Sequence, residues 1–214
     1  MGTPTQLSIY NGALRVLGQA KLSSLTEDRE ARYVLDEIWD DDGVEACLEQ
    51  GYWNFAMAAV QISENTDEAA QFGYTYVFDK PSDWVRTAAF CSDEYFSVPI
   101  LNYLDETDYF FCDVNPVYLK YISNSASYGL NYAGWPESFR KFVHHYFANE
   151  AAATIIKNAK TQEQIELKYR KALSDAKNTD AMNEATRFPV QGTLTRARRG
   201  GSRGDRGNRG SLTG

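Results

Sequence analysis

Few side chains in this sequence have the chemistry of a metal ligand or a general acid–base group. His144 and His145 are the two histidines of the chain, and they are adjacent. Adjacent residues on a helix point about 100° apart, so this pair cannot share one metal ion as an i, i+4 pair can. Glu150 lies five residues after His145, a spacing that suits a shared ion no better. We therefore expect the histidines on a helix surface or at a subunit contact, and we predict no metal site.

The run Asp40, Asp41 and Asp42, followed by Gly43, is the second candidate because carboxylates bind cations. A calcium loop needs carboxylates at alternate positions and a later glutamate, whereas three successive aspartates on a helix fan out around its axis. We interpret the run as a solvated or subunit-facing charge cluster. A hydrolase that uses Glu37 with Asp40 is an alternative, but nothing else in the sequence supports it.

Motifs of nucleophilic or nucleotide chemistry are missing where strands and helices are predicted. There is no nucleophile elbow at a strand-to-helix turn, no phosphate-binding loop that ends in Gly-Lys-Ser/Thr, and no glycine fingerprint of a dinucleotide site. We therefore predict that the protein is not an enzyme, and that it has no catalytic residue and no cofactor.

The strongest charge pattern lies at the end of the chain. Residues 188–214 hold six arginines, seven glycines and one acid, Asp205, for a net charge of +5. Since the whole chain carries −7, residues 1–187 carry −12. We expect an extended C-terminal arm that does not fold by itself and needs a partner. RNA, DNA and an acidic groove on another protein all fit this composition, and an arm without a role is a fourth alternative.

The composition limits the class of protein. With 43% hydrophobic residues in 214, the chain can build one sizeable core, or a core and a small inserted subdomain. We find no stretch near the roughly 20 apolar residues of a membrane span and expect no signal peptide. Cys47, Cys91 and Cys112 are odd in number and far apart, which indicates small buried or half-buried residues in a reducing compartment.

Hydrophobic periodicity predicts four helices, with a β-rich segment between the second and the third. The helices should span residues 5–17, 24–49, 136–157 and 161–178. Gly18 is a natural C-cap for the first, Ser24 and Glu27 fit a capping box for the second, and Asp40–Asp42 would bend or interrupt the second. The candidate strands are residues 57–62, 74–78, 85–91, 95–101, 109–112 and 118–122.

The order of these elements predicts an α+β fold. An antiparallel bundle of about four helices comes from residues 1–62 and 123–187, a small β-rich lobe is inserted at 63–122, and the arm is 188–214. Large aromatic side chains could stack on bases, but they are not interleaved with Lys or Arg, so we interpret them as core or junction anchors. These anchors are Trp39, Trp53, Phe55, Trp84, Trp135 and Phe139.

Several short segments match a known family in order and spacing over about residues 5–187. The first are Asn11-Gly-Ala-Leu-Arg-Val-Leu-Gly18, Leu22-Ser-Ser-Leu-Thr-Glu-Asp28, Ala31-Arg32 and Trp53-Asn54-Phe55-Ala56. The later ones are Pro81-Ser82-Asp83-Trp84-Val85-Arg86, Lys120-Tyr121-Ile122, Trp135-Pro136-Glu137-Ser138-Phe139 and the alanine-rich stretch 148–156. In these segments the chain resembles phage tail tubular protein A, the head-to-tail adaptor (connector) family of tailed bacteriophages.

The resemblance implies a structural virion protein that is assembled in the cytoplasm of the bacterial host and lies at the head–tail junction. Members form a ring of about twelve copies beneath the portal of the capsid. The implied partners are further copies of the chain, the portal protein above and the tail nozzle (tail tubular protein B) below, with tail fibres as a further candidate. Genome DNA passes through the lumen without sequence-specific binding, and no membrane takes part.

The resemblance also suggests a partner for the arm, although an Arg/Gly extension after Gly192 is not a hallmark of the family. Inserted between portal subunits, its arginines would pair with carboxylates. The predicted portal-binding residues are Arg196, Arg198, Arg199, Arg203, Arg206 and Arg209. The alternative function is a nucleic-acid-binding protein that acts through this arm, with binding that weakens steeply as salt rises.

Overall fold

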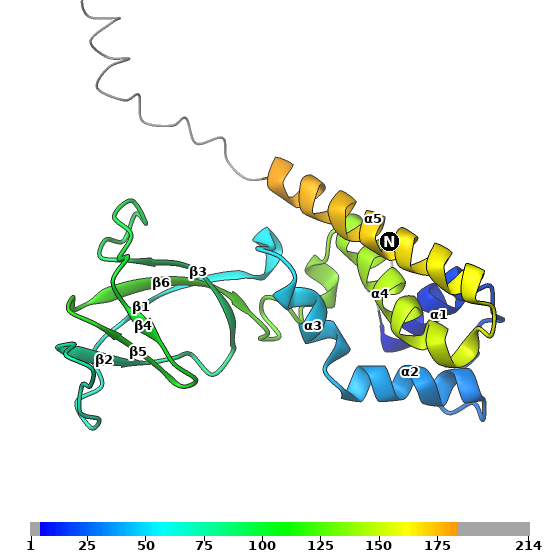
Figure 1. Cartoon of the computed structure of the whole chain (residues 1–214), viewed down its shortest axis with the longest axis horizontal. Helices are drawn as coiled ribbons and strands as arrows, with labels where there is room; N and C mark the ends of the chain where they lie inside the picture. Colours follow the sequence, from blue (N-terminus) through cyan, green and yellow to red (C-terminus); the bar gives the residue numbers. More distant parts are fainter. Residues whose placement is uncertain (1–4, 184–214) are drawn as a thin grey trace, which may run out of the picture. The chain divides into compact units, whose positions relative to one another are not determined.

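The computed structural model describes residues 5–183, and within them the chain folds into five α-helices and two small antiparallel sheets (Figure 1). The predicted α+β class is therefore confirmed. The expected number of about four helices differs from the five α-helices of the described residues, because the second predicted helix is split into two.

Helix α1 (Gln6–Leu17) begins and ends as predicted. The Thr5 hydroxyl accepts a hydrogen bond from the Ser8 backbone N–H, and the Ser8 hydroxyl accepts one from the Thr5 N–H. Gly18 ends the helix in the left-handed region, at φ 71°, where a side chain would be strained. The predicted apolar stripe faces the core, because Tyr10 and Leu14 are fully buried.

The predicted second helix consists of α2 (Glu30–Asp40) and α3 (Gly43–Glu49). Asp42 between them has φ 56°, a left-handed conformation that aspartate tolerates better than most residues. Gly43 is required at this break, since a Cβ there would lie 2.5 Å from the Ile38 carbonyl oxygen. The three aspartates thus interrupt the helix, which was one of the two outcomes that the sequence indicated.

The predicted capping box at the start of this segment is wrong. The carboxylate of Glu27 accepts hydrogen bonds from the backbone N–H and the hydroxyl of Ser23, and the helix begins only at Glu30. The same residue types therefore close a turn before the helix, because Ser and Glu side chains can satisfy the backbone groups of a turn as well as those of a helix end.

Helices α4 (Glu137–Ile155) and α5 (Ala159–Met182) run along each other, and α4 also contacts α1, α2 and α3. The buried side of α4 is rich in aromatic residues, among them Phe142 and Phe147, neither of which has exposed area. Asn158 caps α5 by accepting from the backbone N–H groups of Lys160 and Thr161. The helices therefore gather around α4 as their common partner.

The first sheet has the strand order β1–β6–β3, from Met57–Ile62, Val117–Ser123 and Trp84–Cys91. The second has the order β2–β5–β4, from Tyr76–Asp79, Tyr109–Cys112 and Leu104–Asp105. Strand β1, which the sequence grouped with the helices, pairs with β6 along its whole length, with Met57 opposite Ile122.

The predicted strand at residues 95–101 does not form. Its one ladder contact is a bridge between Pro99 and Cys91. The Asp93 carboxylate accepts hydrogen bonds from the backbone N–H groups of Ser97 and Val98, which closes a turn. Tyr95, Val98 and Leu101 are exposed, Leu101 at 88%, whereas Ile100 packs against the core of the strands. Its β-branched and aromatic composition indicated a strand, but the Asp93 carboxylate takes up the N–H groups that a ladder would use.

Two separate cores follow from the alternation of side chains along the strands. On β6, Leu119 and Tyr121 pack in a core between the strands, while Ile122 packs in the core of the helices. Short 3-10 helices at Asn54–Ala56 and Tyr132–Gly134 connect the helices to the strands.

The three cysteines are buried and free, as their spacing indicated. No helix within residues 5–183 combines the length and apolarity needed to cross a bilayer.

Candidate interaction surfaces

Four of the six predicted aromatic anchors meet around Phe139 on α4. Its ring centroid lies 4.7 Å from that of Phe55, 4.8 Å from that of Trp53 and 4.9 Å from that of Trp135. Both indole N–H groups have partners: Trp53 donates to the Cys47 carbonyl at 3.2 Å and Trp135 to the Gly129 carbonyl at 2.7 Å. This cluster joins the start of α4 to the segments before the first and after the last strand.

The other two anchors take different positions. Trp39 on α2 is half-buried and reaches the cluster through Tyr132, whose ring lies 6.2 Å from Trp39 and 5.0 Å from Trp135. Trp84 is half-buried in the core of the strands, where the Lys80 ammonium lies 3.9 Å from the centroid of its ring. Trp53, Trp135 and Phe139 are buried, and Trp39, Phe55 and Trp84 are half-buried.

A polar contact reinforces the aromatic cluster. The carboxylate of Asp180, near the end of α5, accepts from the Asn54 backbone N–H at 3.0 Å and from the Asn54 side-chain amide at 3.1 Å. Asp180 is 7% exposed, and burial in a low dielectric strengthens such charge-assisted hydrogen bonds. The contact ties the C-terminal end of α5 to the residue that precedes β1.

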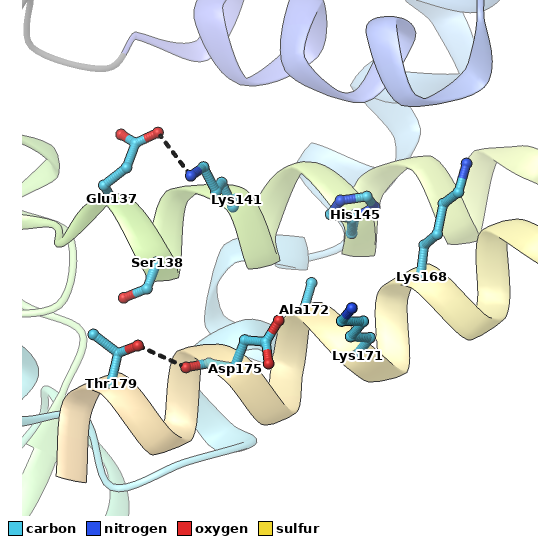
Figure 2. Close-up of a pocket in the computed structure, with 9 residues that line it drawn as sticks. All are labelled: Glu137, Ser138, Lys141, His145, Lys168, Lys171, Ala172, Asp175 and Thr179. Atoms are coloured by element: carbon cyan, nitrogen blue, oxygen red, sulfur yellow. Dashed lines mark hydrogen bonds and ion pairs between the residues drawn. The ribbon is translucent and has the colours of Figure 1, made fainter. Parts of the chain in front are cut away.

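A hollow of about 560 Å³ lies between the outer faces of α4 and α5, and we call it the α4–α5 groove. Figure 2 shows that Lys141 and His145 reach it from α4, and Lys168 and Lys171 from α5. Two acids also line it: Glu137 pairs with Lys141 at 3.9 Å, and Asp175 lies one turn from Lys171. Within residues 5–183, neither Lys168 nor Lys171 makes an ion pair, and the three lysines and two acids that line the groove give it a net charge of +1.

The two histidines sit on either side of this part of α4. His144 packs against α1 so closely that a Cβ on Gly12 would lie 2.3 Å from its Cδ2 atom. Burial, and then the charges of Arg15 and its neighbours, lower the pKa of His144 to about 4. His145 faces the groove, and burial followed by Lys168 lowers its pKa. Both imidazoles are thus neutral at pH 7.

Neither histidine is part of a metal site in the described part of the chain. No group of three or more His, Cys, Asp or Glu side chains there could hold an ion. The Nδ1 atoms of His144 and His145 are buried and have no hydrogen-bond partner among residues 5–183. The prediction placed the pair on a helix surface or at a subunit contact; both rings are half-buried, one against α1 and one in the groove, and the subunit contact stays a prediction.

Acidic groups gather on the other side of the helices. Residues 27–49 contain ten carboxylates and two arginines, a net charge of −8. Exposed residues of α2 and its end follow one another at helical spacing, and we call them the α2 stripe: Glu30, Tyr33, Glu37, Asp40 and Asp41. Within the described residues, the four acids of the stripe make no ion pair and no side-chain hydrogen bond.

The predicted portal-binding arginines 196, 198, 199, 203, 206 and 209 lie outside the described residues.

The α4–α5 groove was not predicted from the sequence. The groove needs Lys141 and His145 from α4 as well as Lys168 and Lys171 from α5. Only the packing register of α4 against α5 brings these side chains together.

Comparison of this chain with protein-family models and with curated proteins finds no match. The geometry described above is therefore the basis for the functional proposal.

Proposed function

We propose that the protein is a head-to-tail adaptor of a tailed bacteriophage, a structural component of the virion. Its copies form a ring beneath the portal that joins the capsid to the tail nozzle and frames the DNA channel. The helices form the bundle of the adaptor, and the strands, which run from Met57 to Ser123, form the β-rich lobe that it bears. The ring lies at the head–tail junction and is assembled in the cytoplasm of the bacterial host.

One observation carries the proposal: segments that are far apart in the chain, and on which the family resemblance rests, are also those that join the fold together. Trp53 and Phe55 pack on Phe139, and Trp135 packs on the same ring. Asn54 binds Asp180 of the last helix. A match in such positions supports a shared architecture, because these residues determine how the helices and strands are connected.

The Pro81–Trp84 motif has a comparable position. The Asp83 carboxylate accepts hydrogen bonds from the hydroxyls of Tyr121 and Ser123, and the Asp83 carbonyl accepts from the Asn124 backbone N–H. The side-chain amide of Asn124 in turn donates to Glu45 of α3 at 2.9 Å. This motif thus links the end of β6 to the helices, which adds to the support for the family architecture.

Charge gives the proposed ring a physical rationale. A closed ring needs heterologous contacts, in which one face of a subunit meets a different face of the next. Residues 27–49 carry a net charge of −8, whereas residues 137–182 carry eight basic and six acidic side chains, a net charge of +2.

The net charge of the body also suits a DNA channel. Residues 1–187 carry −12, which disfavours contacts with phosphate, so DNA would slide through a lumen lined with carboxylates.

The arm at residues 188–214 is the proposed tether to the portal. Its six arginines would insert between portal subunits and pair with carboxylates there, since Arg–carboxylate pairs are strong and often bidentate. This assignment follows from the net charge of +5 on the arm, for which carboxylates are the complementary groups.

The tether is tested by pelleting portal-bearing capsids of the encoding phage with wild-type protein and with a variant that lacks residues 193–214. We expect the deletion to reduce the bound protein at least tenfold. A control that replaces all six arginines with lysine keeps the charge and should retain part of the binding. Equal binding of wild type and deletion would refute the tether.

The nucleic-acid alternative is tested in parallel with the isolated protein and a mixed-sequence DNA duplex. From the adaptor proposal we expect the isolated protein to bind the duplex weakly. Tight binding that falls steeply between 50 and 200 mM salt, and that disappears when the six arginines are replaced by alanine, would favour the alternative.

A further inference from the structure

We propose that the α4–α5 groove of one copy receives the α2 stripe of a neighbouring copy, and that this contact closes the adaptor ring. The inference rests on the proposed function, because it names the surfaces by which ring subunits would meet. It starts from the groove itself, a basic hollow between two helices that nothing within residues 5–183 fills.

The groove offers unpaired cations to an anionic partner. Lys168 and Lys171 are exposed and lack ion pairs within the described residues, and the ion pair of Lys141 with Glu137 is 3.9 Å long between two exposed side chains. Such a pair is weak and can be exchanged for a better one. A carboxylate-bearing partner would pair with these three ammonium groups together.

The α2 stripe has the charge and the length to be that partner. From Glu30 to Asp40 it extends about 15 Å, and the α5 side of the groove, from Lys168 to Thr179, extends about 17 Å. The stripe also includes Tyr33, which is 53% exposed and can add apolar area to a charged contact. A helix laid along a groove between two helices matches a known mode of recognition.

The second acidic region of the chain fits less well. Residues 63–113 hold eleven carboxylates and two basic side chains, but they form strands and loops and no helix that could lie along the groove, and four of the acids already have partners within the same region. Asp93 binds Ser97 and Val98, Asp105 pairs with Lys80, and Asp113 binds Thr75. The acids of the α2 stripe have no such contacts within residues 5–183, so docking would not have to break any.

The two surfaces are also placed so that one copy can use both. Figure 1 shows α5 and α2 on opposite sides of α4, and both helices pack against α4. A subunit could therefore present its groove to one neighbour and its α2 stripe to the other. This head-to-tail arrangement is the kind of contact that a ring requires.

Charge reversal tests the contact on portal-bearing capsids of the encoding phage, with the bound copies counted by quantitative gel densitometry and the ring viewed by negative-stain microscopy. One variant is Lys168→Glu with Lys171→Glu, and the second is Glu37→Lys with Asp40→Lys. We expect each pair to reduce ring formation at least tenfold, and the combined fourfold variant to restore it to within about threefold of wild type.

Matched controls separate this contact from a general effect of charge. Lys160→Glu with Lys177→Glu changes the same helix by the same charge but lies outside the groove, so it should assemble as wild type does. Glu64→Lys with Glu68→Lys tests the second acidic region in the same way. Thermal unfolding of every variant shows whether it is folded.

The outcomes separate the inference from the proposed function. If the wild-type protein forms no ring on the portal, the adaptor proposal and the inference both fail. If the wild type forms a ring that the groove reversal leaves intact, or that the fourfold variant does not restore, only the inference fails. It also fails if Glu64→Lys with Glu68→Lys is the pair that rescues the groove reversal, or if the groove reversal affects DNA binding and not the ring.

Discussion

Protonation of His144 should destabilise the folded chain between pH 7 and pH 5. Its pKa is lowered to about 4 because the ring is buried against α1 and lies near Arg15 and Arg140. In the unfolded chain the same imidazole titrates near 6.5. As the pH falls below 6.5, the imidazole binds a proton in the unfolded state but not in the folded state. The free energy of unfolding therefore decreases as the pH decreases.

The magnitude follows from the two pKa values. The loss between pH 7 and pH 5 is about 2 kcal/mol, and it levels off at about 3 kcal/mol below pH 4. His145 adds a loss of the same sign, because its pKa is also lowered. The lowered pKa values of the Glu27 and Asp93 carboxyl groups act at lower pH, since their contributions disappear only below their unfolded values of 4.5 and 3.8.

Urea unfolding of the wild type and of His144→Gln, each at pH 7 and pH 5, measures this effect. We expect the variant to lose about 2 kcal/mol less over this interval than the wild type does, whatever its absolute stability. His145→Gln serves as the matched control on the adjacent residue and should remove a smaller part of the stability loss between pH 7 and pH 5. An unchanged pH dependence in His144→Gln, or a His144 ring that titrates near 6.5 by NMR, would refute the reasoning.

Three further substitutions test the packing of the helices by urea unfolding at pH 7. Gly12→Ala should cost about 1–2 kcal/mol, since the clash of the new methyl with the His144 ring outweighs the gain in helix propensity; equal or higher stability would contradict this. Asp180→Ala should cost about 1–2 kcal/mol because the Asn54 backbone N–H loses its carboxylate acceptor, although the Asn54 amide keeps the Asp180 carbonyl; a loss below about 0.5 kcal/mol would show that the contact is dispensable. Trp53→Phe, which removes a buried indole and its hydrogen bond to α3, should cost about 2 kcal/mol, and a neutral result would mean that the site repacks.

Local signals in the sequence located most helices and strands. Gly18 ends α1 as expected, because a glycine after an apolar stripe can take the left-handed cap. The break at Asp42 was indicated by three aspartates before a glycine. Such features depend on a few neighbouring residues, so a sequence pattern can identify them.

Features that depend on competition for the same backbone groups were harder to predict. Ser24 and Glu27 matched a capping box, yet Glu27 binds Ser23, and α2 begins three residues after Glu27. Residues 95–101 have strand composition, yet the Asp93 carboxylate takes up the N–H groups of Ser97 and Val98. Here a side chain offers the backbone a local alternative to the helix or the ladder.

The aromatic anchors and the groove show the limit of the sequence for the site. The types of Trp53, Trp135 and Phe139 indicated a junction, but their meeting on one ring depends on how α4 packs. The groove needs the register of α4 against α5, which no local pattern encodes. Charge counts alone did indicate that acidic and basic surfaces are separated along the chain.

The central claim is tested most directly by microscopy of purified portal-bearing capsids of the encoding phage, with and without this protein. The adaptor proposal predicts a closed ring of added density beneath the portal, with rotational symmetry, in the sample that contains the protein. Portals that stay bare at saturating protein concentration, or protein bound along released DNA and not at the portal, would contradict it.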